Sequence, residues 1–248
     1  MSLDYTDDQE NARPPTAEEL AEAEAAMSAT PVYTYLLLVC IAAVMIAEVS
    51  AGMQNSISAA AFDKPQFIHD REYWRILTGA AMHGSFAHVL LNSWALYSFG
   101  RLVEILSNRA HLAIVFLLSA VGGGILSLFF VPEGTSVGAS GGVVGLMGYL
   151  AVYAFRRRKF ISPEFRRSLL INIGFILIFG LILYQIIDNW GHIGGLVTGA
   201  VYGFIQIPGD VYKDPRVARP ITEIAGLIAL GIFVATSIFT IFTLLQFV

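Results

Sequence analysis

The sequence predicts an all-α protein, a polytopic membrane helix bundle. Three observations support this: 56% of the 248 residues are hydrophobic, only 14% are charged, and the mean hydropathy is +0.65. Soluble globular domains usually carry about 25% charged residues, so this chain has too few to cover a water-exposed surface. The net charge of −4 argues against a nucleic-acid-binding domain, and the single cysteine, Cys40, cannot form an internal disulfide.

Apolar stretches of about 20 residues indicate helices long enough to cross about 30 Å of hydrocarbon. Seven such stretches, some short and glycine-rich, are expected here: 32–49, 82–100, 111–131, 141–155, 169–187, 190–207 and 221–248. The sequence therefore predicts a six-helix core over residues 31–207, followed by a cytosolic linker and a seventh helix over 208–248. Residues 1–30 carry eight acidic residues against one basic residue and are expected to form a disordered cytosolic tail.

The basic residues predict the orientation of the chain, because cytoplasmic loops of membrane proteins are enriched in Lys and Arg. With the N-terminus inside, twelve basic residues lie on the cytoplasmic side and three, Lys64, Arg71 and Arg75, lie outside. We therefore expect a multi-pass protein of the cell membrane, with a cytoplasmic N-terminus and the C-terminus outside.

Polar side chains inside membrane spans are costly and often functional. Four are expected here: His88 and Asn92 in the second span, Ser140 at the head of the fourth and His192 at the head of the sixth. A rise of 1.5 Å per residue places Ser140 about 24 Å and His192 about 22 Å above the inner edge, and it places His88 about 20 Å and Asn92 about 14 Å above it. Any one of them alone would more often be structural, but together they predict one shared cavity that opens outward.

The residues around Ser140 sharpen this prediction. The string Gly-Ala-Ser-Gly-Gly at 138–142 places a hydroxyl where an outer loop becomes a helix, and free N–H groups there could bind an oxyanion. Three glycines follow His192 at four-residue spacing: Gly195, Gly199 and Gly203. Such a face allows two membrane helices to touch. Packing it on the helix of Ser140 would bring His192 within hydrogen-bonding distance of the serine.

These motifs resemble those of the rhomboid family of intramembrane serine proteases, over about residues 70–207. The motifs are Trp74-Arg75, His83 with His88 and Asn92, Gly138-Ala139-Ser140-Gly141, and His192 with Gly195, Gly199 and Gly203. The resemblance implies a rhomboid-like six-helix core and a Ser–His dyad without a carboxylate. Ser140 would be the nucleophile, and His192 the general base that later protonates the leaving amine.

The resemblance also implies an oxyanion hole and a class of substrate. His88, Asn92 and the backbone N–H of Ser140 would form the oxyanion hole. Supporting positions would be His83, Gly138, Gly141, Gly195 and Gly199. The implied partners are transmembrane protein substrates, cleaved near their outer ends, and the lipid bilayer; no nucleic acid, cofactor or metal is implied.

Two departures from the family pattern stand out. Glu104 matches a structural motif with Gly100 before it, but Asn108 replaces the second glycine and is expected to keep the turn because it tolerates left-handed backbone. Val144 stands where the family often has an aromatic ring that stacks on the histidine. The glycines at 145 and 195 are expected to leave room for a larger side chain there.

Other interpretations remain open. His88 and His192 could ligate a haem in an electron carrier, although this would not explain the Gly-Ala-Ser-Gly-Gly string. A catalytically inactive rhomboid-like protein that binds membrane clients is a second alternative. Asp188 could orient His192 as a third triad member, but we expect it to face water, and Glu48 is expected to reach the membrane interface.

Overall fold

The computed structural model describes residues 30–210 and 212–246. The predicted acidic tail, residues 1–30, lies outside the described residues except for Thr30, so its disorder stays a prediction. Within the described ranges, one long helix corresponds to each predicted span. These helices are α2 (Val32–Ala51), α6 (Phe86–Leu106), α7 (Arg109–Phe130), α8 (Ser140–Arg156), α9 (Pro163–Ile182), α10 (Asn189–Gln206) and α11 (Pro220–Leu245).

The length and composition of these helices identify a polytopic membrane bundle. In the described chain, four of them, α2, α7, α9 and α11, are long and apolar enough to cross a membrane. The glycine-rich helices α8 and α10 are not long and apolar enough to be included. Glycine contributes little to mean hydropathy, and α8 has only 17 residues. The predicted all-α class is therefore correct, and the count of seven spans stays a prediction.

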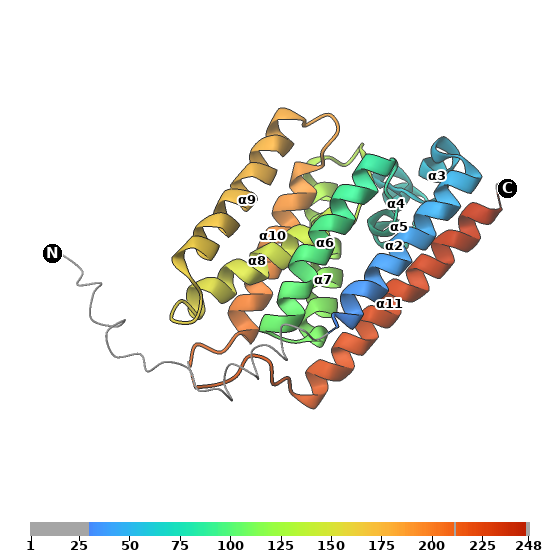
Figure 1. Ribbon diagram of the computed structural model, residues 1–248. Coiled ribbons are helices and arrows are strands. Elements are labelled where there is room, and N and C mark those ends of the chain that lie inside the picture. Colours follow the sequence, from blue (N-terminus) through green and yellow to red (C-terminus); the bar gives the residue numbers. More distant parts are fainter. Residues whose placement is uncertain (1–29, 211, 247–248) are drawn as a thin grey trace. The chain divides into compact units, whose positions relative to one another are not determined.

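The bundle places the helices of Ser140 and His192 in its interior. In Figure 1, α2 and α11 run side by side along one edge and α9 lies at the opposite edge, with α6, α7, α8 and α10 between them. α8, α10 and α7 pack closely on one another, while α11 packs on α2 and α7. α9 contacts mainly α8 and α10 and leaves most of its apolar side chains exposed, as a lipid-facing helix does.

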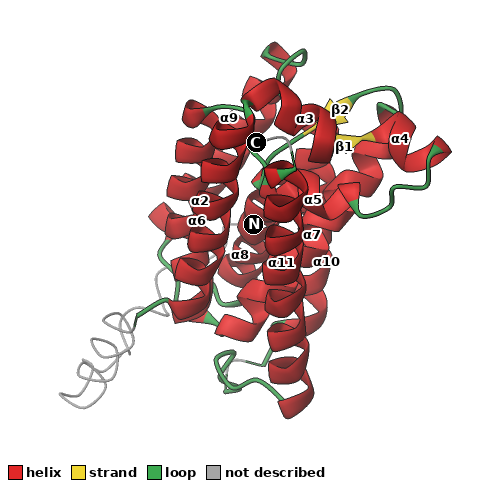
Figure 2. Cartoon of the chain, turned by 90° about the vertical axis from the view of Figure 1, so that its right-hand side faces the viewer, coloured by secondary structure: helices red, strands yellow, loops and turns green. Residues whose placement is uncertain are grey.

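A set of short elements connects α2 to α6 outside the bundle core. They are α3 (Met53–Ala60), β1 (Phe62–Asp63), α4 (Lys64–His69) and α5 (Arg75–Ala81). β1 pairs antiparallel with β2 (Thr135–Ser136), with Phe62 opposite Ser136 (Figure 2). This two-stranded sheet therefore joins the long loop to the segment that leads into Ser140.

The turn between α6 and α7 differs from the sequence-based expectation. Glu104 accepts hydrogen bonds from the backbone N–H and the hydroxyl of Thr34, both at 2.7 Å. Asn108 is extended, with φ −165°, rather than left-handed. Its side chain instead caps α7 through the N–H of Ala110 at 2.7 Å, so the turn is held by a capping bond that replaces the expected glycine-like backbone.

Candidate active site

Ser140 is the first residue of α8, and the residues before it are shaped by close contacts. Gly138 has φ +126°, and a Cβ at this position would lie 2.7 Å from Cε1 of His88. Both the backbone conformation and the space therefore require glycine. The N–H of Val143 bonds the carbonyl of Ala139 at 3.0 Å, whereas those of Ser140, Gly141 and Gly142 have no partner inside their own helix and are available to an anion that approaches Ser140.

The backbones of α8 and α10 touch along their glycines, as the spacing predicts. A Cβ on Gly195 would lie 2.1 Å from the carbonyl oxygen of Gly141, and one on Gly199 would lie 1.9 Å from that of Gly145. No side chain larger than hydrogen fits at either position. This contact sets the helix that begins with Ser140 directly against the helix that carries His192.

His192 lies in the first turn of α10 and is 8% exposed. Its Nδ1 is buried and has no hydrogen-bond partner within the described ranges. No hydrogen bond joins His192 to Ser140 in the described residues. Catalytic hydrogen bonds are often long or poorly aligned until substrate binds, so the helix contact, rather than a formed dyad bond, is what the structure contributes.

The polar residues of α6 lie beside the loop that precedes Ser140. Nδ1 of His88 lies 2.7 Å from the carbonyl oxygen of His83, and Nδ2 of Asn92 donates to the carbonyl of His88 at 3.1 Å. His83 is buried, and its Nε2 accepts a long hydrogen bond of 3.5 Å from the N–H of Ala139. His83 therefore contacts the segment that leads into Ser140 and forms part of the wall next to the serine.

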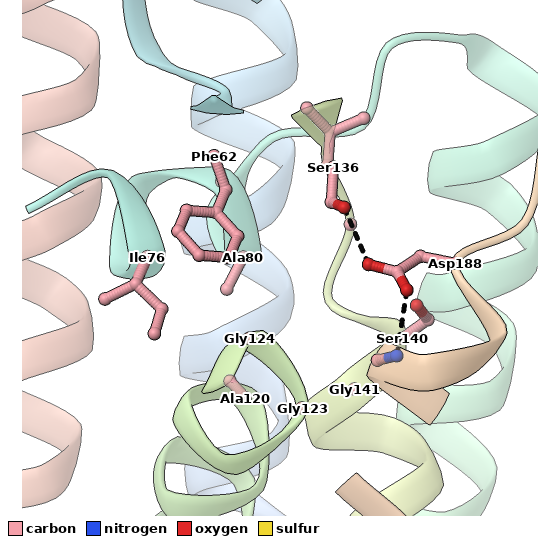
Figure 3. Close-up of a pocket in the computed structure, with 14 residues that line it drawn as sticks. Phe62, Ile76, Ala80, Ala120, Gly123, Gly124, Ser136, Ser140, Gly141 and Asp188 are labelled. Atoms are coloured by element: carbon pink, nitrogen blue, oxygen red, sulfur yellow. Dashed lines mark hydrogen bonds between the residues drawn. The ribbon is translucent and has the colours of Figure 1, made fainter. Parts of the chain in front are cut away.

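A cavity of about 50 Å³ lies beside Ser140. Phe62, Ile76 and Ala80 line one side of it, and Ser136, Ser140 and Asp188 lie across from them (Figure 3). His88, Asn92 and His192 do not line this cavity. The four polar residues predicted to share one cavity are thus brought to neighbouring helices, with Ser140 alone of the four facing this cavity. In the described chain, no group of three metal-binding side chains is found.

Asp188 is only partly exposed to water, at 26% of its side chain, and its carboxylate is bonded to protein donors, contrary to expectation. It is the N-cap of α10 and accepts hydrogen bonds from the N–H of Gly191 at 2.9 Å, from Ser136 at 2.6 Å and from Ser127. No bond from its carboxylate to His192 is found among these described residues, so a triad role for Asp188 is not supported. The capping position is the reason, because a carboxylate at a helix start is drawn to the free N–H groups.

Glu48 does not reach the interface either. It is fully buried, and its two carboxylate oxygens accept hydrogen bonds from the N–H groups of His83 and Gly84 at 3.1–3.2 Å. The expectation failed because these partners are backbone groups, which leave no mark on the sequence. An acidic residue inside an apolar span is itself the signal that could have indicated a buried role.

The chain is similar to known proteins over most of the residues that form the site. The family profile described as the Rhomboid domain matches residues 70–209. The chain belongs to the rhomboid family. This rhomboid is 33% identical over 187 residues to "Rhomboid protease GluP" of Bacillus subtilis (strain 168), covering 73% of this chain and 36% of that protein. It is 33% identical over 149 residues to "RHOMBOID-like protein 6, mitochondrial" of Arabidopsis thaliana, covering 59% and 48%.

Relatives of this rhomboid include one whose name denotes an inactive protein. "Inactive rhomboid protein 1" of Rattus norvegicus is 30% identical over 139 residues, which is 55% of this chain and 16% of the relative. The chain spans less than half the length of each of these three curated relatives. These matches show the family, and they cover only part of each relative.

Two further polar residues near the site were not found from the sequence. Lys64 is 1% exposed, and its Nζ donates to Ser136 Oγ at 2.9 Å. In the sequence, Lys64 is distinguished only as one of three basic residues on the predicted outer side, and nothing near Ser136 indicates a buried partner. The one local signal is a lysine followed by proline in a loop otherwise rich in aromatic residues.

Proposed function

We propose that this rhomboid is an intramembrane serine endopeptidase that cleaves transmembrane segments of other membrane proteins near their outer ends. One observation carries the proposal: the backbone contact of Gly195 with Gly141 and of Gly199 with Gly145 sets the helix of Ser140 against the helix of His192. A serine nucleophile needs a general base close enough to take its proton, and this helix contact brings the two helices that carry Ser140 and His192 together. The similarity to a protein named as a rhomboid protease supports it.

The proposed chemistry is acyl transfer through a Ser–His dyad. His192 takes the proton of Ser140 Oγ while that oxygen attacks the scissile carbonyl carbon. The tetrahedral intermediate then expels the amine, which receives the proton from His192. Water gives a proton to His192 while its oxygen attacks the carbonyl carbon of the acyl-enzyme. The bond to Ser140 Oγ then breaks, the new carboxyl end is released, and His192 returns the proton to Ser140 Oγ. The Asp188 carboxylate is already engaged by hydroxyl and N–H donors, which is consistent with a dyad that has no third member.

The oxyanion formed in these steps needs donors. The free N–H of Ser140 is one, and Asn92 is the second, because only one Nδ2 hydrogen is needed for its bond to the His88 carbonyl. His88 is constrained differently. A carbonyl oxygen can only accept, so His88 Nδ1 carries the proton toward the carbonyl of His83. The neutral ring then offers Nε2 as an acceptor, and His88 donates to an oxyanion only when doubly protonated.

The position of the nucleophile suits a substrate that enters from the outer leaflet. A peptide bond inside an intact helix is hydrogen-bonded and shielded by side chains, so a substrate helix must unwind before Ser140 can reach it. The small cavity beside Ser140 leaves room for a short side chain next to the cleaved bond. We place the N-terminus in the cytoplasm and the C-terminus outside a cell membrane, on the asymmetry of basic residues.

Reaction with a fluorophosphonate tests this function, because the reagent labels only an activated serine. Purified wild-type protein should be labelled and should cleave a transmembrane substrate, whereas Ser140→Ala and His192→Ala should do neither while staying folded. Ser98→Ala is the matched control, since the Ser98 hydroxyl bonds only its own helix at the Trp94 carbonyl. Robust cleavage by Ser140→Ala would end the proposal.

The second candidate function is that of a membrane-client binding protein without catalysis. The 30% identity to a protein named as an inactive rhomboid favours keeping it. The same experiment separates the two: a folded wild-type protein that is never labelled, yet retains transmembrane proteins, would establish the binding function.

A further inference from the structure

The carboxylate of Asp188, beside Ser140, contacts side chains from three other segments of the chain. Oδ2 of Asp188 accepts hydrogen bonds from Ser127 on α7 and from Ser136 on β2, the latter at 2.6 Å, and lies 3.9 Å from Nζ of Lys64 on α4. Oδ1 caps α10 through the N–H of Gly191 at 2.9 Å. Ser136 joins the cation to the anion, because it accepts from Lys64 at 2.9 Å and donates to Asp188. We call Lys64, Ser127, Ser136 and Asp188 the Asp188 cluster.

The charges of the Asp188 cluster depend on one another. The Lys64 side chain is 1% exposed and that of Asp188 is 26% exposed. Burial lowers the pKa of Lys64, while the nearby carboxylates of Asp188 and Asp63 oppose that change. Burial alone would raise the pKa of Asp188, but the bonds from Ser127, Ser136 and Gly191 outweigh it and hold the pKa below its usual value. Buried charges persist only where partners compensate for lost hydration, so the cluster stays assembled as a unit.

The cluster lies at equivalent distances along the chain from both members of the proposed dyad. Ser136 lies four residues before Ser140, and Asp188 lies four residues before His192. The bond between Ser136 and Asp188 therefore ties the approach to the nucleophile to the start of the helix that carries the base. Figure 3 shows this bond on the wall of the cavity that also contains Ser140.

The turn that Asp188 caps is the same turn that packs against the neighbouring helices. A Cβ on Gly123 of α7 would lie 2.5 Å from the carbonyl oxygen of Gly191, and one on Gly141 of α8 would lie 3.6 Å from it. A rotation of this turn would thus move His192 relative to Ser140 and would also bring the turn into collision with α7. The hydrogen bond from Gly191 to Asp188 and the close packing of Gly191 on α7 together hold the first turn of α10 in place.

We propose that the Asp188 cluster is a positioning device, in which Lys64 and Ser136 hold Asp188 so that the first turn of α10 presents His192 to Ser140. The inference rests on the proposed serine-protease function. Ser136 and Asp188 line the cavity beside Ser140, but the role proposed for the cluster is exerted through the geometry of the dyad rather than through contact with substrate. A misplacement of the reacting groups by about 1 Å, caused by a residue away from the chemistry, can lower a catalytic rate by on the order of 100-fold. The position of His192 relative to Ser140 therefore strongly affects the rate.

The sharpest variant is Ser136→Ala, because it removes the link between cation and anion and leaves both charges in place. The rate of fluorophosphonate labelling reports the reactivity of Ser140 without any substrate. We expect the labelling rate per folded molecule and kcat to fall together by on the order of tenfold, with KM unchanged. The melting temperature should fall as well, because the variant removes hydrogen bonds to two largely buried charges. Ser136→Thr keeps a hydroxyl on Cβ and should restore both rates.

Two further variants test the same inference: Asp188→Asn should lower the labelling rate, and Thr135→Ala should not. Asp188→Asn keeps an oxygen that can cap Gly191 but replaces an acceptor of the serine hydroxyls with an N–H donor, so it should lose labelling rate as Ser136→Ala does. Thr135→Ala is the matched control, since the Thr135 hydroxyl is exposed and bonds Asp63 outside the cluster. Its labelling rate should equal that of the wild type.

The outcomes distinguish this inference from the function on which it rests. If wild-type protein is labelled, Ser140→Ala is not, and Ser136→Ala is labelled as fast as wild type, the inference is wrong and the protease proposal stands. A purely structural role would lower the melting temperature of Ser136→Ala without changing the labelling rate per folded molecule, and this too would overturn it. A wild-type protein that is never labelled would remove both proposals together.

Discussion

Glu48 accepts hydrogen bonds from the backbone N–H of His83 on both of its carboxylate oxygens, at 3.1 Å each. A third bond, from the N–H of Gly84 at 3.2 Å, shares one of these oxygens. Glu48 lies on α2, so a side chain of the first long helix fixes the loop from which α6 begins. Because His83 in turn contacts Ala139 and His88, this buried acid sets the wall next to Ser140.

Glu48→Gln should destabilise the protein. The amide keeps one acceptor oxygen but turns N–H groups toward the backbone donors of His83 and Gly84, which leaves buried donors unpaired. Such a loss costs about 1–3 kcal/mol in the free energy of unfolding. Thermal unfolding in detergent measures it. Glu133→Gln, at an exposed position, is the control, and an equal melting temperature for both variants would contradict the role given to Glu48.

Gly199→Ala tests the contact between α8 and α10. The new Cβ would lie 1.9 Å from the carbonyl oxygen of Gly145, so the two helices must separate. We expect loss of both stability and proteolysis. Gly174→Ala on α9 is the matched control, because no atom lies within 4 Å of a Cβ there. It should be neutral or more stable by up to about 1 kcal/mol, since alanine is the better helix former. Equal stability and equal proteolysis in the two variants would mean that the glycine contact between α8 and α10 contributes to neither.

Asn92→Ala tests the oxyanion donor. Loss of one such donor lowers kcat by on the order of 10²–10³, and the remaining N–H of Ser140 should leave measurable turnover. Asn55→Ala serves as control, because the Asn55 amide makes the same type of bond to a carbonyl four residues earlier, at 3.0 Å from Ala51. Steady-state cleavage at saturating substrate gives kcat for both variants. Turnover in Asn92→Ala equal to that of Asn55→Ala would remove Asn92 from the oxyanion hole.

The orientation can be tested independently of catalysis. A reporter that is active only outside the cytoplasm, fused after Val248, should be active. The same reporter placed after Lys159, between α8 and α9, should be silent, because the basic residues 156–159 are expected inside. The reverse pattern would invert the proposed topology.

Features that depend on local pattern were predictable, and features that depend on distant partners were not. Hydropathy located each long helix, and the four-residue spacing of glycines after His192 correctly predicted contact with the helix of Ser140. The start of α6 was misplaced, because Ser85 caps that helix and Phe86 begins it. The pairing of β1 with β2 brings Lys64 beside Ser136, and Ser136 in turn bonds Asp188 at the start of α10; no local window of the sequence contains these contacts.

The space around Val144 is smaller than the sequence predicts. Gly145 and Gly195 were expected to leave room for a larger neighbour. A Cβ on Gly145 would instead lie 2.0 Å from Ser119 Oγ, and one on Gly195 would lie 2.1 Å from the Gly141 carbonyl oxygen. The space beside Gly145 is therefore already filled by α7 and α10 and that beside Gly195 by α8, and Val144 itself is 3% exposed.

Val144→Phe should consequently overpack the interior rather than be tolerated. Extra methylene groups in a filled core cost about 1–3 kcal/mol in the free energy of unfolding, because neighbours must leave their preferred rotamers or the backbone must shift. Here the shift would open the contact between α8 and α10, so turnover per folded molecule should fall as well. Val201→Phe, at a 53% exposed position on α10, adds the same ring toward lipid and should change neither quantity. Melting temperature and turnover measured on both variants decide the matter: a Val144→Phe protein as stable and active as Val201→Phe would show that room for an aromatic ring exists after all.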